Sequence, residues 1–317
     1  MPGPITVEEL RTLPPRLSGD VLALAVRAAR HDGVRPLSEQ TVLEARRVAE
    51  EAPTGSASTH LVATQDDRVV AYGHVDEGDA QAPSAELVVD PDHRRRGVGG
   101  ALLDHALRRW PSVRLWSHGD LQDARRLYTS RSLVVVRELW QMSLPLRGEW
   151  CELPEVRDLP EGLVVRPFRV GSDEEPWLAV NARAFAHHAE QGRMTGTDLR
   201  ERQSEPWFDP QGFLLVEDVT ARDPDGGPRL AAFHWTKVEP GSSTGEVYVV
   251  GVDPDYQGRG LGRSITVLGL HHLRAVGCET ATLYVDGDNA AAIATYGKLG
   301  FERSAVDVMY AAGPDAS

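Results

Sequence analysis

Hydrophobic and polar residues alternate along the chain in two patterns, one with the spacing of helices and one with that of strands. Up to about Arg47 the apolar residues recur every three or four positions, which predicts helices. Residues 60–64 and 68–75 are short apolar runs separated by the polar turn Gln65-Asp66-Asp67, which predicts a β-hairpin. We therefore expect helices at the start of the chain, followed by paired strands.

The second half of the chain repeats this order of elements. Strands are predicted at residues 162–167, 212–218, 229–238 and 280–285, helices after Ser172 and from about Asn289, and a closing strand at residues 306–311. The segment 146–161 is rich in Pro, Glu and Arg, which is typical of a linker. We therefore expect two domains, at residues 1–145 and 162–317.

A strand, a turn and a helix start in the second half carry three closely spaced glycines. Residues 246–252 are rich in Val and Tyr, and Asp253-Pro254-Asp255 ends the strand because proline has no N–H to donate. Gly258, Gly260 and Gly262 follow, at the start of a helix predicted at about residues 260–275. Backbone N–H groups at such a helix start carry partial positive charge and suit a pyrophosphate. The glycine spacing fits neither a dinucleotide fold nor a P-loop.

The same motif occurs earlier in the chain. Asp90, Pro91, Arg94, Gly97 and Gly99 stand 163 positions before Asp253, Pro254, Gln257, Gly260 and Gly262. Agreement at a strand end and at two loop glycines indicates two copies of one domain. The strand-helix-strand crossover after each hairpin predicts a mixed sheet with helices on its faces, an α/β fold of the α+β type, with the ligand at the carboxyl end of a strand.

Composition limits the partners and the compartment. The chain has 317 residues and a formal net charge of -13, with 47 acidic against 34 basic residues, which argues against nucleic acid or an anionic membrane as a partner. The two cysteines suit a reducing compartment, no apolar run is long enough to span a bilayer, and the first residues lack the features of a signal peptide. We expect a cytoplasmic monomer. His93-Arg-Arg-Arg96, beside the first glycine turn, is then a candidate phosphate clamp.

The second glycine turn, Gln257-x-x-Gly260-x-Gly262, resembles the coenzyme A loop of the GNAT superfamily of N-acetyltransferases. Asn289, Ala292 and Tyr296 share one helix face, which adds to the resemblance. In that superfamily the asparagine faces the pantetheine arm of the coenzyme and the tyrosine reaches its sulfur. The resemblance implies two tandem GNAT domains, each with a mixed central sheet flanked by helices, and acetyl-CoA as co-substrate without a metal.

Acetyl transfer from a thioester to an amine needs a proton acceptor for the amine and a proton donor for the departing thiolate. Glu246, at the start of the central strand, is the candidate base, acting through water, and Tyr296 is the candidate acid. Backbone N–H groups at Val250, Gly251 and Val252 are candidate donors to the carbonyl oxygen if the strand splays there, an opening that Gly251 permits.

The first copy lacks an equivalent base at the same distance from its glycine turn. Pro83 stands 163 positions before Glu246 and cannot accept a proton. Glu86 stands where Val249 lies in the second copy, and the two-residue period of a strand predicts that it faces the other way.

The first copy does retain a tyrosine. Tyr128 mirrors Tyr296, but Leu121 stands in place of Asn289. We therefore predict that chemistry occurs only in the second domain, and that the first domain is structural or binds coenzyme without turnover.

Longer motifs resemble one family within this superfamily, the two-domain mycothiol synthases of actinobacteria. The resemblance covers nearly the whole chain and is strongest in the second half. It rests on Asn181-Ala-Arg-Ala-Phe-Ala186, Glu190-Gln-Gly192, Trp207-Phe-Asp-Pro210, Phe233-His-Trp-Thr-Lys-Val238, Gly245-Glu-Val-Tyr-Val249 and Leu283-Tyr-Val285. It implies transfer of the acetyl group of acetyl-CoA to the cysteinyl amine of 1D-myo-inositol 2-(L-cysteinylamino)-2-deoxy-α-D-glucopyranoside, the last step of mycothiol biosynthesis.

The resemblance also implies roles for individual residues. Substrate contacts fall on Glu39, Glu190, Lys237, Glu246 and Tyr284. Coenzyme contacts in the second domain fall on Val250, Gly251, Val252, Gln257, Gly258, Arg259, Gly260, Leu261, Gly262, Arg263, Asn289, Ala290, Ala291, Ala292, Ile293 and Ala294. A second coenzyme site in the first domain falls on Leu87, Val88, Val89, Arg95, Arg96, Gly97, Val98, Gly99 and Gly100. A small cationic amino sugar suits carboxylates and a few donors, and Lys237 is one of only two lysines in the chain.

Two other interpretations stay open at this point. The loop motifs fit equally well an acetyltransferase for another amine, such as an aminoglycoside or a protein N-terminus, and only the surroundings of Glu190, Lys237 and Tyr284 distinguish it. A non-catalytic acetyl-CoA sensor would bind coenzyme without releasing thiol, and the joint presence of Glu246 and Tyr296 disfavours it.

Overall fold

The computed structural model describes residues 3–47, 57–148, 152–186, 189–223 and 226–313. The chain divides into two compact units. Unit 1 comprises Met1–Trp140, Asp286–Asp288 and Ala305–Ser317, and unit 2 comprises Gln141–Val285 and Asn289–Ser304. The last stretch of the chain therefore groups with unit 1, although it stands at the end of the second predicted domain in the sequence.

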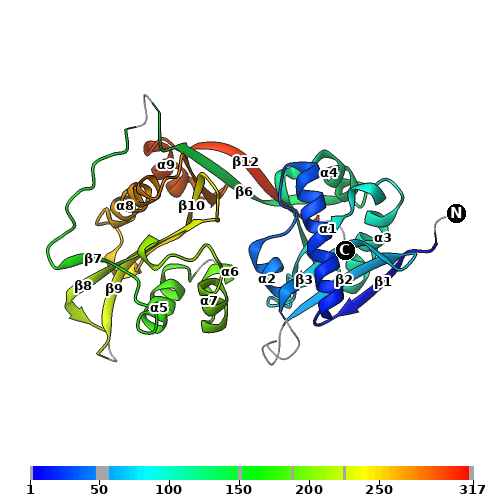
Figure 1. Ribbon diagram of the computed structural model, residues 1–317, viewed down its shortest axis with the longest axis horizontal. Helices are drawn as coiled ribbons and strands as arrows, with labels where there is room; N and C mark the ends of the chain where they lie inside the picture. The colour runs from blue at the N-terminus through cyan, green and yellow to red at the C-terminus, as the bar shows by residue number, and fades with distance from the viewer. Residues whose placement is uncertain (1–2, 48–56, 149–151, 187–188, 224–225, 314–317) are drawn as a thin grey trace. The chain divides into compact units, whose positions relative to one another are not determined.

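Unit 1 is built on a mixed sheet with the strand order β1-β2-β3-β4-β5-β12-β6. Pairing is antiparallel from β1 to β4, parallel between β4 and β5, and antiparallel between β5 and β12. The elements are β1 (Thr6–Leu10), α1 (Pro15–Asp32), α2 (Glu39–Arg46), β2 (Ser58–Gln65), β3 (Arg68–Asp76), β4 (Ser84–Val89), α3 (Val98–Arg109), β5 (Arg114–Ser117), α4 (Gln122–Thr129), β6 (Leu133–Pro145) and β12 (Glu302–Ala312). Helix α1 packs on one face of this sheet, and α3 with α4 packs on the other (Figure 1).

The predicted hairpin and the two predicted helices are present, but the chain begins with a strand that the sequence did not predict. The β2–β3 hairpin is confirmed, and its turn residues Asp66 and Asp67 have positive φ angles of 49° and 59°, the conformation of a tight two-residue turn. Helices α1 and α2 are also confirmed, but the chain opens with a strand that was not predicted. Strand β1 pairs antiparallel with β2, because five residues before the Pro14-Pro15 pair are too few for a stable helix and can form an edge strand.

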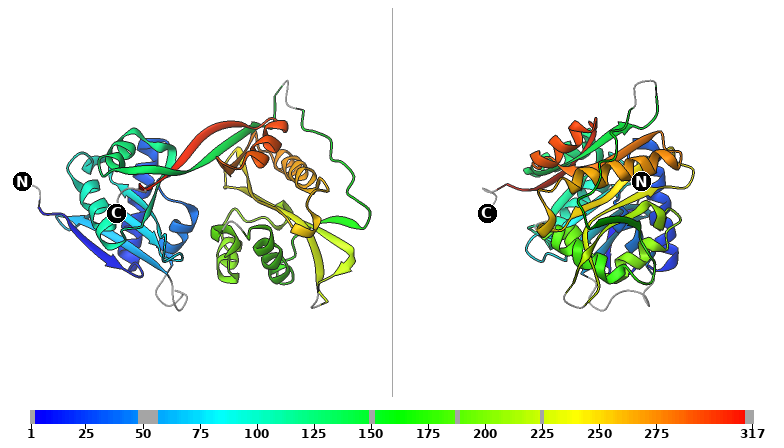
Figure 2. Two further views of the ribbon diagram at one scale, coloured as in Figure 1. Left: turned by 180° about the vertical axis from the view of Figure 1, so that it is seen from behind. Right: turned by 90° about the vertical axis from the view of Figure 1, so that its left-hand side faces the viewer.

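Unit 2 repeats the plan with the strand order β12-β6-β11-β10-β9-β8-β7. The elements are β7 (Leu163–Pro167), α5 (Glu174–Ala184), α6 (Ala189–Gly192), α7 (Gly196–Gln203), β8 (Phe213–Arg222), β9 (Pro228–Val238), β10 (Thr244–Val252), α8 (Leu261–Ala275), β11 (Thr280–Asp286) and α9 (Ala290–Lys298). The strands and helices predicted for this half are present. Figure 2 shows α8 on one side of β8, β9 and β10, and α5 with α7 on the other.

Two apolar clusters hold the layers of unit 2 together. On the α5 and α7 side, Trp177, Phe213 and Trp235 are fully buried, and the rings of Phe213 and Trp235 stack with centroids 4.4 Å apart. On the α8 side, Leu261 and Ile265 pack against strand residues. This burial fixes α8 against the strand that leads into the glycine turn.

The closing strand is present, and its last part belongs to unit 1. Val308, Met309 and Tyr310 pair antiparallel with β5. The ring of Tyr310 packs 5.0 Å from the ring of Tyr128, and its hydroxyl donates to Asp120 Oδ1 at 2.8 Å. The end of the chain therefore completes the sheet and the core of unit 1.

In the part of the chain that the structure describes, no helix combines the length and the apolar composition needed to cross a bilayer.

Replacing Tyr310 with alanine should destabilise unit 1 selectively. Tyr310 is 2% exposed, and removing a buried aromatic ring costs about 3–5 kcal/mol of unfolding free energy. Hydrogen exchange measured by mass spectrometry should show loss of protection in β5 and β2 but not in β8. Glu302→Ala, an exposed change at the start of the same strand, is the control and should leave both units protected. Equal loss in β8 and β5 would contradict the assignment of this strand.

Candidate active site

The second glycine turn has the geometry of an anion-binding helix start. Asp253 follows β10, and its side chain accepts a hydrogen bond from the N–H of Asp255. Gly258 and Gly260 have φ angles of 75° and 78°, a conformation that favours glycine, and Gly260 caps α8 without any side chain. A Cβ at either glycine would meet no atom within 4 Å. The space beside both glycines is therefore open, and the N–H groups of the first turn of α8 suit phosphate oxygens.

Two arginines hold the aspartate that starts this turn. Arg183 of α5 donates to both oxygens of Asp253, at 2.7 and 3.1 Å, and Arg229 of β9 adds a contact at 3.4 Å. Burial raises the pKa of Asp253, but the hydrogen bonds and charge of Arg183 outweigh it and lower the pKa below its usual value. The carboxylate therefore stays charged and fixes the turn.

Unit 1 builds its glycine turn in the same way. Asp90 accepts from the N–H of Asp92 and binds Arg27 of α1, as Asp253 binds Arg183. Gly97 caps α3 with a φ of 86°, and Arg95 takes the left-handed conformation that Gly258 has in unit 2. The duplication predicted from the sequence therefore extends to a salt bridge between each turn and the first α-helix of its unit.

One arginine of the proposed phosphate clamp has a structural role. Arg94 binds Asp32 with two hydrogen bonds of 2.7 Å and donates to the carbonyl oxygen of Val89 at 3.2 Å. Its counterpart Gln257 reaches the carbonyl oxygen of Val252 at 3.4 Å. Arg94 therefore ties the turn to α1, whereas the exposed Arg95 and Arg96 remain the predicted phosphate contacts.

The opening expected beside the candidate carbonyl donors is present. The parallel pairing of β10 with β11 ends at Glu246 and Thr282, and beyond this point the backbone of β10 pairs only with β9. In unit 1, β4 and β5 part in the same way after Glu86 and Trp116. Gly251 also has a packing role that was not predicted, because a Cβ there would lie 2.6 Å from Phe233. The glycine makes room for this ring.

The expected direction of Glu86 is wrong. The register between β10 and β9 shifts between Val247 and Val249, so Glu246 and Val249 face the same side although they are three residues apart. Glu86 at the Val249 position therefore faces the same side of its sheet as Glu246 does. A regular two-residue period does not hold across a bulge.

Glu86 is held in a buried charge network. Its carboxylate accepts from the N–H of Ser38 at 3.0 Å and lies 3.1 Å from His118 Nε2, and His118 Nδ1 lies 3.0 Å from Asp307. Burial opposes both charges, but the hydrogen bonds between them prevail, lowering the pKa of Glu86 to about 2 and raising that of His118 to about 10. A carboxylate with so low a pKa is a poor base, which agrees with a first copy that lacks turnover.

Lys237 lies on the same face as Glu246, its partner across the two strands. Its ammonium is 4.7 Å from the centre of the Trp207 ring, 5.4 Å from that of Tyr248, and 3.3 Å from Glu239 Oε1. Cation–π contacts of this kind attract an ammonium to the ring faces and so fix its position. Trp235 beside it is fully buried, so it packs the core and does not stack on a sugar.

Tyr296 lies on α9, whose first turn is capped by Asn289. The Asn289 side chain accepts from the N–H of Ala292 at 3.0 Å. The Tyr296 ring packs edge-on against Phe301 with centroids 5.9 Å apart, and burial raises its pKa to about 12. The phenol is therefore protonated at neutral pH, as a proton donor must be. Its counterpart Tyr128 is fully buried.

The other predicted substrate residues are spread over the chain. Tyr284 on β11 is 46% exposed and lies two positions after Thr282, on the face of Glu246. Glu39 is the first residue of α2 in unit 1. Glu190 lies in α6, and its side chain is outside the described part of the structure.

Sequence reasoning missed Arg183, Arg229, Arg202 and Tyr248. Arg202 of α7 donates from Nε to the hydroxyl of Tyr248 at 2.7 Å. The preponderance of arginine over lysine in this chain hides individual arginines, so composition gave no signal. Tyr248 stood inside a recognised motif, but its spacing does not reveal the bulge.

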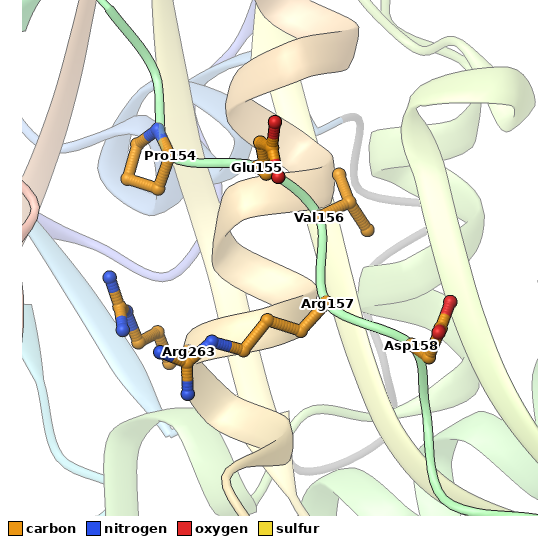
Figure 3. A pocket seen from close by; sticks show the side chains of 6 residues that line it. All are labelled: Pro154, Glu155, Val156, Arg157, Asp158 and Arg263. Atoms are coloured by element: carbon orange, nitrogen blue, oxygen red, sulfur yellow. The ribbon is translucent and has the colours of Figure 1, made fainter.

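A cavity of about 570 Å³ lies beside the second glycine turn, between α8 and the linker that precedes β7. Figure 3 shows Arg157 of the linker extending toward Arg263 of α8. The linker is held there by His271, whose Nε2 lies 2.9 Å from the carbonyl oxygen of Pro154. Two guanidinium groups at a helix start add positive charge beside the predicted phosphate site.

Within the described ranges, no group of three or more His, Cys, Asp or Glu side chains is arranged to hold a metal ion.

Comparison with known proteins shows that both halves of the chain match acetyltransferase models. A model of the acetyltransferase (GNAT) family matches residues 182–301, and a model of the acetyltransferase (GNAT) domain matches residues 56–131. A mycothiol acetyltransferase of Kytococcus sedentarius is 53% identical over 96% of this chain and 95% of its own length. One of Cellulomonas flavigena is 47% identical over 99% and 91%. A solved tandem GNAT protein from the clavulanic acid biosynthesis pathway matches with a TM-score of 0.67 over 98% of this chain and all of its own, at 19% identity, and so supports the tandem fold.

The buried histidine of unit 1 predicts a stability that falls at alkaline pH. Because the pKa of His118 is raised from 6.5 to about 10 on folding, its contribution is complete below pH 6.5 and is lost as the pH rises through about 10. Urea unfolding at pH 7 and 9 should show a loss of up to a few kcal/mol. The loss should be smaller in His118→Gln and unchanged in His31→Gln, which alters an exposed histidine. An identical loss in His118→Gln would contradict the network.

Proposed function

The chain belongs to the family of mycothiol acetyltransferases, and we propose that its unit 2 acetylates the cysteinyl amine of 1D-myo-inositol 2-(L-cysteinylamino)-2-deoxy-α-D-glucopyranoside. It is an N-acetyltransferase with two GNAT domains, and its reaction is an acetyl transfer of mycothiol biosynthesis. The identity of the acceptor, the role of acetyl-CoA and the roles of the residues below are parts of the proposal.

The observation that carries the proposal is the position of Glu246. It is the last residue of β10 that pairs with β11, and so it stands where the two strands part. The open backbone at Val250, Gly251 and Val252 follows on the same strand and leads into the glycine turn. A proton acceptor, carbonyl donors and a phosphate site thus lie in order along one strand, which is the order that a thioester and an incoming amine require.

Acetyl-CoA binds in this proposal with its pyrophosphate on the turn of residues 257–263 and its thioester carbonyl at the open backbone of β10. Arg259 and Arg263 lie in the turn and at the start of α8, where positive charge favours phosphate. Backbone N–H groups that no longer pair with β11 donate to the carbonyl oxygen, which gains negative charge as the amine attacks.

Glu246 accepts the proton that the acceptor ammonium must lose before it can attack. The transfer runs through a water molecule, since the base is expected at some distance from the amine. Attack by the neutral amine on the thioester carbon breaks the carbon–sulfur bond, and Tyr296 gives its proton to the departing thiolate. A phenol whose pKa is raised to about 12 holds this proton at neutral pH and delivers it to the thiolate only in the reaction.

Acceptor recognition is assigned to Lys237, Tyr284, Glu190 and Glu39. The ammonium of Lys237, beside Glu246, contacts the rings of Trp207 and Tyr248, which fix its position. Its N–H groups suit the hydroxyl groups of a sugar or an inositol. Tyr284, which is 46% exposed, lies on the same face. The two glutamates suit a cationic substrate. Glu246 faces the amine through the water molecule that carries the proton.

Substituting the base and the acid should lower turnover without loss of coenzyme. Glu246→Gln and Tyr296→Phe should each reduce kcat at least tenfold, while the affinity for acetyl-CoA stays within about twofold. Release of coenzyme A thiol and equilibrium binding of acetyl-CoA measure the two quantities. Tyr128→Phe makes the same chemical change in the first copy and should leave kcat unchanged. A large loss of acetyl-CoA affinity in either variant would reassign that residue to binding.

Competition between amines tests the acceptor. The proposed cysteinyl amino sugar should exceed glucosamine, an aminoglycoside and a peptide N-terminus by at least 100-fold in kcat/KM, because several polar groups would be left unpaired with the others. Thiol release with each amine measures the ratios. A better rate with any other amine would reassign the acceptor, and no thiol release with any amine would support a sensor.

A further inference from the structure

Strand β10 holds an extra residue close to the proposed base. Its pairing with β9 shifts register between Val247 and Val249, which leaves Tyr248 as the extra residue of a β-bulge. In unit 1, β4 pairs with β3 in unbroken register from Ser84 to Val89. The bulge is therefore a difference between the unit with a candidate base and the unit without one.

The bulge determines which way Glu246 faces. Val250 and Val252 pack on the α8 side of the sheet, whereas Glu246 pairs with Lys237, whose ammonium lies on the opposite side. Six residues separate Glu246 from Val252, and in a regular strand that even spacing would place both on one face. Removing the bulge while the glycine turn stays in place would therefore turn the carboxylate of Glu246 into the α8 core.

Helix α7 holds Tyr248 in the bulge. Arg202 Nε donates to the Tyr248 hydroxyl at 2.7 Å, and Arg202 Nη1 donates to the carbonyl oxygen of Asp198 at 3.0 Å. Arg202 is 7% exposed, so its guanidinium is a buried charge that depends on such acceptors. The Tyr248 ring packs against Trp207 and Trp235, each with centroids 5.1 Å apart. The extra residue is thus held by a charged hydrogen bond and by contacts with two rings, and its own ring also contacts the ammonium of Lys237.

We propose that Arg202 and Tyr248 are positioning residues that lock the bulge of β10 and thereby keep Glu246 on the acceptor side of the sheet. This inference rests on the proposed function, because it takes Glu246 as the base. The residues act through the backbone of β10, and neither needs to touch the acetyl group or the amine.

If the hydrogen bond between Arg202 and Tyr248 locks the bulge, which we call the lock, two variants that remove this bond should lose kcat to a similar extent. Tyr248→Phe keeps the ring contacts and removes only the acceptor for Arg202, and Arg202→Met keeps length and removes the donor. Each should lower kcat at least tenfold, with the KM for acetyl-CoA within twofold of the wild type. The double variant should be no slower than the slower single variant, because one hydrogen bond is lost in all three. Tyr310→Phe, which removes a tyrosine hydroxyl bonded to Asp120 in unit 1, is the control and should retain kcat.

Hydrogen exchange gives a second readout that does not depend on turnover. The amides of Val247 to Val250 should exchange at least tenfold faster in Tyr248→Phe and Arg202→Met than in the wild type, while those of β8 keep their rates. If one variant does not fold, the other gives the same comparison.

The outcomes separate the lock from the proposed function. A folded variant with kcat within twofold of the wild type, or losses that multiply in the double variant, overturns the lock. Unchanged exchange in β10 also overturns it. If the wild type fails to acetylate the named amine, the proposed function fails, and faster exchange confined to β10 still supports the lock itself.

Discussion

The chemistry proposed for unit 2 depends on the point at which two parallel strands stop pairing. Up to Glu246, β10 is bonded on both sides, and beyond it the backbone is bonded to β9 alone. Backbone N–H groups left open on one side need another acceptor, and in the proposed reaction a thioester carbonyl is that acceptor. The same break places a carboxylate at one end of the open stretch and a glycine turn at the other. In the proposed reaction, coenzyme binding and proton transfer thus both depend on the point where β10 stops pairing with β11.

The two units show how a shared scaffold can differ in chemistry. Both part their parallel strands after a glutamate, and both tie the aspartate before the glycine turn to an arginine of the first α-helix of the unit. In unit 1 the glutamate is bound by Ser38 and by a histidine that carries a positive charge. That environment lowers its pKa to about 2 and suppresses its basicity. Both units thus have a glutamate at this point, and they differ in the residues that surround it.

Much of this architecture could be predicted from the local pattern of residue types along the sequence. Proline and glycine at fixed spacing revealed both turns, and alternating apolar residues revealed the strands. The sequence did not reveal the bulge at Tyr248, because an extra residue leaves no mark in composition, and the direction of Glu86 was wrong for that reason. The sequence also did not reveal that Gly251 makes room for the ring of Phe233, because that contact joins residues on neighbouring strands. The partner of the closing strand was also hidden, since pairing between residues far apart in the chain is a tertiary choice.

The strand at the end of the chain carries a consequence for biosynthesis. Gly119 and its bonded partner Asp307 are 188 positions apart, so the sheet of unit 1 lacks one strand until β12 has been made. At typical elongation rates of 5–20 residues per second, that interval lasts roughly 10–40 s. During this time β5 presents an unpaired edge to the surroundings of the ribosome. The half of the protein that emerges first is thus among the last parts to finish folding.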